Sequence, residues 1–311
     1  DYEGNMKAFI AYPGSKYRVF WDLIGGILIL YDLILIPMKV FEMPETTFLI
    51  TMDWITLIFW TGNVGATLTS GFVKQGVTIM SPSRILFNYL KTWCIVDCVV
   101  LGPDWAFTIL ASGSGTESVK MLRMLRLART VRLLRLFKLK WILDSINDYL
   151  DSEFMSIITN IVKMVLFLLA INHFIACMWF LITSDSGDGL NWIKKYGYED
   201  VDWSMQYLTA FHWSITQFTP AGMEVNPTNE TERIFTLCVV VFALVGFSYV
   251  VGSITGSLTQ LRGLSEQATK EFWLLRRFLK RNEVPQVLAL RIQRFVEHAF
   301  HRQQKQMSVK Q

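Results

Sequence analysis

The sequence contains a row of basic residues that recurs at every third position inside an otherwise apolar segment, 119–140. Placing one arginine in a bilayer costs at least about 2.5 kcal/mol on insertion scales, so such a row needs compensating groups and a purpose. One elementary charge that crosses 100 mV is worth about 2.3 kcal/mol, which suits a membrane-embedded row to sensing voltage. The residues predicted to sense voltage are Arg123, Arg126, Arg129, Arg132, Arg135 and Lys138, and Lys120 begins the row.

Two alternatives for the row are a basic helix at the membrane interface and an amphipathic helix that binds anionic lipid. Both alternatives need one basic face and one apolar face. A three-residue spacing instead winds around an α-helix, and it forms one straight row only on a 3₁₀-helix. The spacing therefore favours a voltage sensor.

Basic side chains inside a membrane need counter-charges in neighbouring segments. Asp53 and Asp97 lie within apolar runs, and an acid in such a position is a functional candidate by default. Trp60 follows Asp53 about two turns later, with Asn63 just beyond it. We therefore predict that counter-charge and charge transfer are provided by Asp53, Trp60, Asn63 and Asp97. Further candidates in the first apolar run are Asp22 and Asp32.

The composition indicates an integral membrane protein. The 311 residues are 52% hydrophobic and only 18% charged, against roughly 25% charged in soluble domains. The apolar runs suffice for about six helices of roughly 20 residues, the length that crosses a bilayer. A soluble enzyme and a disordered protein are excluded, and the sequence shows no catalytic constellation, no cofactor site and no nucleic-acid-binding surface. We predict a multi-pass protein of the cell membrane.

Helix is expected for every spanning run, because a backbone exposed to lipid must satisfy its own hydrogen bonds. The run Trp203–Phe218 is too short to cross and is predicted to be a re-entrant pore helix. Basic residues between the second and third runs, and acidic loops on the other side, among which we place Asp104, put both termini in the cytoplasm. The predicted spans are 20–38, 48–68, 92–110, 119–140, 154–183 and 234–261.

These runs divide an all-α membrane protein into a four-helix voltage sensor and a pore domain. The short linker leaves no room for a long crossing helix, so each sensor should pack beside the pore segment of its own subunit. The tail is predicted to contain two amphipathic helices, 263–281 and 285–304. The expected boundaries are 1–19 for a cytoplasmic lead, 20–141 for the sensor, 142–153 for the linker, 154–261 for the pore domain and 262–311 for the cytoplasmic tail.

The residues after the pore helix are predicted to form an ion filter. Potassium filters stack the carbonyls of a Thr-Val-Gly-Tyr-Gly loop. Thr219 and Gly222 fit that frame, whereas Pro220 and Met223 depart from it and the second glycine is missing. The predicted filter residues are Thr219, Pro220, Ala221, Gly222, Met223 and Glu224.

Loss of the second glycine predicts a shorter and wider filter, crowned by four Glu224 carboxylates that favour cations. We expect cations to bind there only in transit, with no resident metal. The prediction is a weakly selective pore for Na⁺ and K⁺, with Ca²⁺ as a further candidate and potassium selectivity as the alternative. The last span supplies Ile254 or Leu258 as the predicted hydrophobic gate.

Several motifs carry a family resemblance. The third span begins with Asn88-Tyr89-Leu90-Lys91-Thr92-Trp93-Cys94-Ile95-Val96-Asp97, and shorter motifs are Trp21-Asp22, Tyr31, Pro37, His173, Ala176, Cys177, Trp179 and Val284-Pro285. Together they resemble the channel superfamily that contains ether-à-go-go, hyperpolarisation-activated and cyclic-nucleotide-gated channels. The resemblance extends over nearly the whole chain.

The resemblance implies a non-domain-swapped homotetramer in a lipid bilayer, with a tail that begins the family's C-linker. It also implies an acid where Asn63 stands, so we expect a weaker inner site with Asp97 as its main acid. A cyclic nucleotide could bind only in a region outside this chain, and the sequence leaves auxiliary subunits and gating polarity open. A voltage-sensor protein without a pore and a transporter are alternatives. The apolar runs that follow the basic row argue against a sensor without a pore, and the absence of inverted repeats argues against a transporter.

Overall fold

The computed structural model describes residues 10–111, 130–139, 153–184, 189–219 and 221–309. Two compact units emerge. The first comprises Asp1–Asp148 with Leu169–Val240, and the second comprises Tyr149–Leu168 with Val241–Gln311. The predictions for Arg123, Arg126, Arg129 and Pro220, and for the linker up to residue 152, lie outside the described residues.

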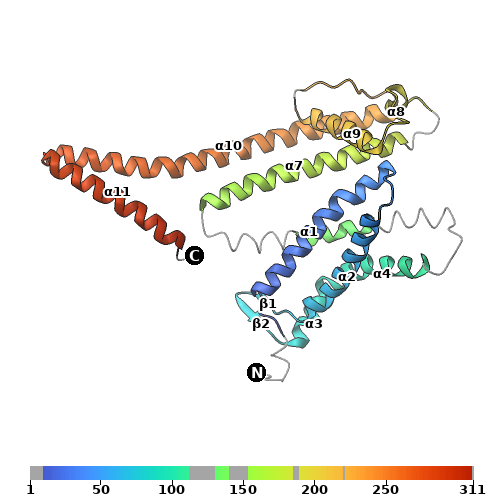
Figure 1. Ribbon diagram of the computed structural model, residues 1–311, viewed down its shortest axis with the longest axis horizontal. Coiled ribbons are helices and arrows are strands. Elements are labelled where there is room, and N and C mark those ends of the chain that lie inside the picture. Colours follow the sequence, from blue (N-terminus) through green and yellow to red (C-terminus); the bar gives the residue numbers. More distant parts are fainter. Residues whose placement is uncertain (1–9, 112–129, 140–152, 185–188, 220, 310–311) are drawn as a thin grey trace. The chain divides into compact units, whose positions relative to one another are not determined.

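The described chain is predominantly helical (Figure 1). The first unit contains α1 (Lys16–Met38), η2 (Lys39–Phe41), α2 (Thr47–Leu68), β1 (Phe72–Lys74), β2 (Val77–Ile79), α3 (Pro82–Thr92), α4 (Cys94–Ala111), η3 (Arg132–Arg135), α8 (Trp192–Lys195) and α9 (Trp203–Phe218). The helices α7 (Glu153–Ser184) and α10 (Glu230–Arg281) have residues in both units, and α11 (Gln286–Val309) lies in the second.

Side chains at the helix starts explain where several elements begin. The hydroxyl of Ser15 accepts a hydrogen bond from the Arg18 backbone N–H, and Thr46 does the same for Leu49, so both act as N-caps. The antiparallel hairpin of β1 and β2 turns at Gln75 and Gly76, both of which have positive φ, as a two-residue hairpin turn requires.

Three helical stretches of the described chain are long and apolar enough to cross a membrane: Lys16–Phe41, Phe154–Ser184 and Glu230–Gly263. A fourth candidate is the pair Pro82–Thr92 and Cys94–Ala106, which is bent by 68°. The helix α2, which carries Asp53 and Asn63, falls outside these candidates although its 22 residues suffice in length. The apolar spanning helices expected from the sequence are therefore present in part.

Most predicted runs correspond to a helix, and α9, the predicted pore helix, has the predicted bounds, Trp203–Phe218. The predicted separation between the last span and a first tail helix is wrong. The helix α10 continues without a break from Glu230 to Arg281, because Gly263 alone costs only about 1 kcal/mol in a helix and no proline follows until Pro285. The helix ends before Glu283, whose φ is 53°, and α11 extends to Val309.

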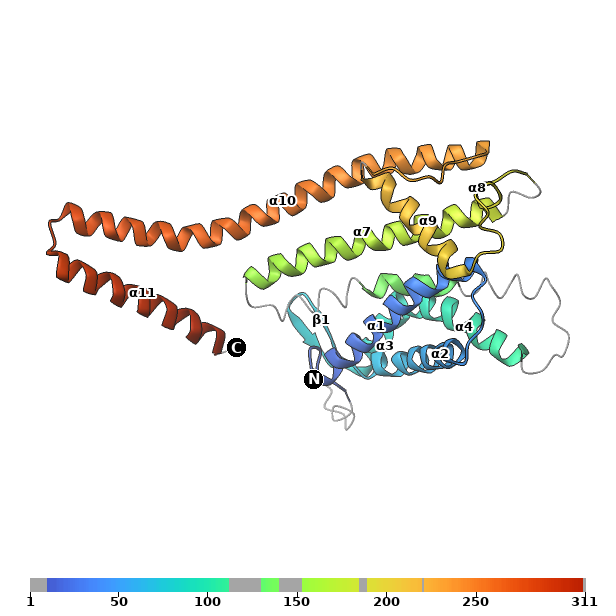
Figure 2. The ribbon, with the colours of Figure 1, turned by 45° about the horizontal axis from the view of Figure 1, so that its top comes forward.

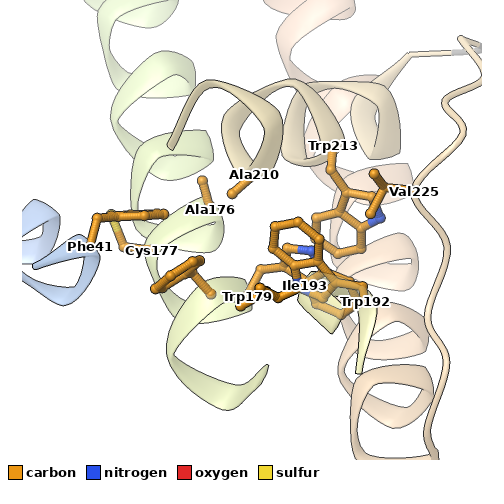
Figure 3. Close-up of a cluster of buried hydrophobic side chains, with 10 residues drawn as sticks. Phe41, Ala176, Cys177, Trp179, Trp192, Ile193, Ala210, Trp213 and Val225 are labelled. Atoms are coloured by element: carbon orange, nitrogen blue, oxygen red, sulfur yellow. The ribbon is translucent and has the colours of Figure 1, made fainter. Parts of the chain in front are cut away.

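A cluster of buried aromatic side chains forms the core beside α9 (Figure 3). Trp179 of α7 stacks on Trp213 of α9, with ring centroids 4.0 Å apart, and Trp192 of α8 is stacked 6.1 Å from Trp179. We call this group the tryptophan cluster. Its buried members are Phe41, Ala176, Cys177, Trp179, Phe180, Trp192, Ile193, Ala210, Trp213 and Val225.

Candidate functional site

Two of the described basic residues of the row, Arg132 and Arg135, lie in the 3₁₀-helix η3 (Arg132–Arg135), and Lys138 follows in α-helical conformation. A 3₁₀-helix is the conformation in which a three-residue spacing aligns on one side. The helices α1 and α4 contact η3, and Figures 1 and 2 show α1, α2 and α4 gathered around this segment. Both arginines are buried, so the surrounding helices must supply their partners.

Arg132 is held by two carboxylates from different helices. Its Nε lies 2.9 Å from Oδ1 of Asp104 in α4, and one terminal guanidinium nitrogen lies 2.9 Å from Oδ1 of Asp53 in α2. The Asp53 carboxylate is about one-third exposed and is also 3.7 Å from Lys39 Nζ. Arg132 therefore joins α2 to α4 through charge-assisted hydrogen bonds.

Arg135 is held in the same way one step further along the row. Its guanidinium donates to Asp32 of α1 and to the second oxygen of Asp104, both at 3.3 Å. Asp104 thus binds two successive arginines, one through each carboxylate oxygen. A buried charge is tolerated when it is paired and hydrogen-bonded, and these paired contacts meet that condition.

Trp60 lies between the last two basic residues of the row. The centre of its ring is 5.1 Å from Arg135 Cζ and 5.0 Å from Lys138 Nζ, distances at which cation–π attraction operates. Lys138 also pairs with Asp97 at 2.5 Å. The hydroxyl of Tyr89 donates to the other oxygen of Asp97 at 3.0 Å, so the carboxylate is fixed on both sides.

Asn63 is buried near this position, where it acts as a hydrogen-bond acceptor. Its Oδ1 accepts from the Trp21 indole N–H at 3.0 Å, which joins α1 to α2. The nearby acid of α1, Asp22, pairs with Arg18 at 3.1 Å. The four residues predicted for counter-charge and charge transfer thus lie within one bundle, three of them in contact with the row and Asn63 bonded to α1.

The sequence prediction missed the role of Asp104. The sequence places this residue in an outer acidic loop, but its carboxylate is buried in α4 and binds both Arg132 and Arg135. The signal was available, because Asp97 and Asp104 are seven residues apart and therefore share one face of a helix. Pairing of Asp32 with Arg135 also makes that candidate a direct partner of the row.

The predicted filter follows the C-terminus of α9, and its described residues 221–224 belong to no helix or strand. Burial alternates along it, because Met223 and Val225 pack on the tryptophan cluster while Gly222 and Glu224 are exposed. The side chain of Asn226 donates to the backbone carbonyl of Glu224 at 2.9 Å. The Glu224 carboxylate is therefore presented on the side of the segment that faces away from the core.

The two predicted gate residues lie one turn apart on the same face of α10. Ile254 is partly buried and Leu258 is exposed in the single chain. Among the described residues, no group of three or more His, Cys, Asp or Glu side chains could hold a metal ion.

Known proteins match this chain over most of its length. The ion transport protein family matches residues 18–266. A mouse voltage-gated inwardly rectifying potassium channel, KCNH7, is 24% identical over 317 aligned positions, which cover 92% of this chain and 26% of the mouse protein. The Drosophila melanogaster potassium voltage-gated channel protein eag is 25% identical over 315 positions, covering 90% of this chain and 25% of that protein.

A guinea-pig channel of the same kind, KCNH2 from Cavia porcellus, is 23% identical and covers 92% of this chain. The chain spans about a quarter of the length of the curated relatives that it matches. The resemblance inferred from the sequence is confirmed.

Proposed function

The chain belongs to the ion transport protein family, and on that premise we propose that it is the sensor and pore region of a voltage-gated cation channel. It is a multi-pass, predominantly helical membrane protein. The observation that carries the proposal is the row formed by Arg132, Arg135 and Lys138, which lies among acids from three helices and contacts Trp60. Residues 20–141 are its sensor, and Arg123, Arg126 and Arg129 extend the row.

The contacts suggest how the row moves in an electric field. Basic residues follow one another every three positions, which on a 3₁₀-helix corresponds to a rise of about 6 Å. An inward displacement of that length carries each residue into the place of the next one, so Arg135 would take the partners of Lys138 and Arg132 those of Arg135. Because Asp104 serves two successive positions, a passing charge keeps one carboxylate throughout the step.

The observed arrangement corresponds to an outward position of the row. Loop charges place Asp53 toward the outer side and Asp97 toward the cytoplasm. Lys138 is the last of the predicted sensing residues, and it already lies at Trp60 and Asp97. An inward movement would bring the earlier arginines to Trp60 in turn. With roughly three charges moved in each of four subunits, the field supplies tens of kcal/mol for gating.

The sensor is proposed to contact the pore of its own subunit in a homotetramer. Phe41 follows the first sensor helix and packs on two pore-domain rings. Its ring centroid lies 4.2 Å from that of Phe180 in α7 and, edge-on, 5.5 Å from that of Tyr207 in α9. These contacts lie within one chain and one compact unit, which supports a non-domain-swapped arrangement. Both termini are cytoplasmic in this proposal, and 262–311 begins the C-linker.

The pore is proposed to be weakly selective for Na⁺ and K⁺. The exposed Glu224 residues of four subunits would form a carboxylate ring beside Gly222, which favours cations without choosing between them. The filter lacks the second glycine of the potassium type, so it offers fewer stacked carbonyls. In this proposal Ile254 and Leu258 close the inner mouth by dewetting.

Potassium selectivity is the second candidate, and the comparisons favour it. The three relatives described above are named as potassium channels. A voltage-sensor protein without a pore is less well supported, because the chain continues into α7, α9 and α10.

Voltage-clamp recording of the full protein, with Na⁺ and K⁺ exchanged across the membrane, tests the proposal. A voltage-dependent current whose reversal potential responds to both ions supports the weakly selective pore. A reversal potential that follows K⁺ alone selects the second candidate. If charge moves with voltage but no ionic current appears, the pore is rejected and the sensor-only alternative is supported.

A further inference from the structure

One fully buried carboxylate is used by neither the basic row nor the filter. Glu232 lies in the first turn of α10, and its side chain has no solvent exposure. Its backbone N–H donates to Oδ1 of Asn229 at 2.8 Å, which caps the helix. The local sequence therefore starts α10 in a way that turns Glu232 into the protein.

Each oxygen of the Glu232 carboxylate faces a different part of the outer pore region. Oε1 accepts from the backbone N–H of Trp192 in α8 at 3.1 Å and lies 3.3 Å from the Thr183 hydroxyl of α7. Oε2 accepts from the backbone N–H of Thr228 at 2.7 Å and from its hydroxyl at 2.9 Å. One side chain thus joins the start of α10 to α7, to α8 and to the loop after the filter.

No basic side chain of the described chain lies within ion-pairing distance of Glu232. A buried carboxylate without a cation is costly unless hydrogen bonds stabilise it. The two backbone N–H donors and the N-terminus of α10 provide that stabilisation. These donors belong to the main chain, so the contacts hold backbone segments in place.

The backbone segment that Glu232 holds at Thr228 is the continuation of the predicted filter. Thr228 comes four residues after Glu224, and between them Val225 packs into the tryptophan cluster. Trp192 belongs to the same cluster and donates its backbone N–H to Glu232. The predicted filter segment is therefore held by apolar packing at Met223 and Val225, and by hydrogen bonds at Thr228.

We propose that Glu232 is a positioning residue that keeps the ion filter in its conducting shape by tying the loop after the filter to α7 and α8. The inference rests on the proposed channel function. Glu232→Gln replaces one carboxylate oxygen, which accepts hydrogen bonds, by an amide N–H₂ group, which donates them. The hydrogen bonds to either Trp192 or Thr228 are therefore lost. A filter loosened in this way should close more readily during a maintained stimulus and should discriminate differently between ions.

The test compares Glu232→Gln with Glu230→Gln in the full protein under voltage clamp. Glu230 lies two residues earlier in the same helical turn and is exposed, so it is a matched control for loss of one carboxylate. We expect the current of Glu232→Gln to decay at least about tenfold faster at constant voltage, with an altered Na⁺-to-K⁺ permeability ratio. The gating-charge midpoint should stay at its wild-type value, because the sensor contacts are untouched.

Equal decay and equal permeability in the two variants would overturn the inference. If the wild-type protein carries no voltage-dependent current, the proposed function fails instead, which keeps the two claims distinguishable.

If Glu232→Gln shows no gating charge and so does not reach the membrane, a second variant, Thr228→Val, provides the test. That variant removes one hydroxyl donor and retains the backbone N–H, with Thr228→Ser as its control. Faster decay supports the inference, and wild-type decay overturns it.

Discussion

The basic row and the tryptophan cluster are both buried in the first compact unit, but different forces hold them. In the row, Arg132 and Arg135 contact carboxylates from three helices, and Asp104 is shared between them. In the tryptophan cluster, Trp179 and Trp213 stack at 4.0 Å with nearly parallel rings. The first arrangement depends on charge and the second on shape.

This difference indicates which region can move. A carboxylate accepts any basic residue that arrives at the right distance, so a row displaced by three residues can still find carboxylate partners. Close-packed aromatic rings have no such second arrangement, because every neighbour would lose its contacts at once. The tryptophan cluster is thus suited to stay fixed during the movement that we propose for the row.

The largest effect should come from breaking the fixed region. Trp213→Ala removes a stacked and fully buried ring, and such a cavity costs about 3–5 kcal/mol. We expect thermal unfolding of the purified protein to occur several degrees lower. Trp273→Ala, which truncates an exposed tryptophan of α10, is the control. Equal losses in the two variants would mean that the cluster does not contribute the stability assigned to it.

The next largest effect should come from removing one charge of the row. Arg135→Gln leaves Asp32 and Asp104 without a shared cation, at a cost of about 3 kcal/mol to the proposed outward position. Spread over roughly three moving charges, this corresponds to a shift of about 40 mV in the gating-charge midpoint. Because the outward position is destabilised, the midpoint should move to more positive potentials. Arg135→Lys keeps the charge and should shift it less, whereas a negative shift for Arg135→Gln would contradict the outward assignment.

The sequence predicts the helices of this chain better than it predicts the contacts between them. Apolar runs and an N-cap such as Asp202, whose side chain accepts from Ser204, are local signals, and the bounds of α9 follow from them. The end of the last span had no local signal. Hydrophobicity falls after Leu261, but nothing there breaks a helix, so α10 continues through the predicted boundary.

In the candidate site, too, local sequence signals reveal single residues better than the contacts between them. Asp53, Trp60 and Asp97 could be found because each lies in an apolar run, where an ionisable or large aromatic group needs a reason. Asp104 was missed because acidic residues near the end of a run resemble loop residues. Its shared role depends on two arginines that are 28 and 31 positions away in the sequence, and only the packed bundle brings them together.

The two acids that bind Arg132, Asp104 and Asp53, should differ in their effect on the gating-charge midpoint. Asp104→Asn affects both arginines in a buried site and should cost about 2 kcal/mol, which corresponds to a positive midpoint shift of about 30 mV. Asp53→Asn affects a partly exposed carboxylate and should cost less than about 1 kcal/mol, or on the order of 10 mV. Gating-charge measurements on both variants provide the test. A larger shift for Asp53→Asn would show that Asp104 is not the principal partner.

The smallest effect should come from restoring an acid at Asn63. This residue lies one turn beyond Trp60, whose ring is 5.0 Å from Lys138 Nζ, and Asn63→Asp would still accept the Trp21 hydrogen bond. The added charge should stabilise Lys138 in its observed place by about 1 kcal/mol and move the gating-charge midpoint about 15 mV to more negative potentials, opposite in sign to Arg135→Gln. Asn63→Leu removes the hydrogen bond without adding charge and should not move the midpoint in that direction. If both variants shift the midpoint equally, the bond between α1 and α2 sets the voltage dependence there, and the charge at this position does not. An unchanged midpoint and slope in Asn63→Asp would remove position 63 from the charge-transfer path.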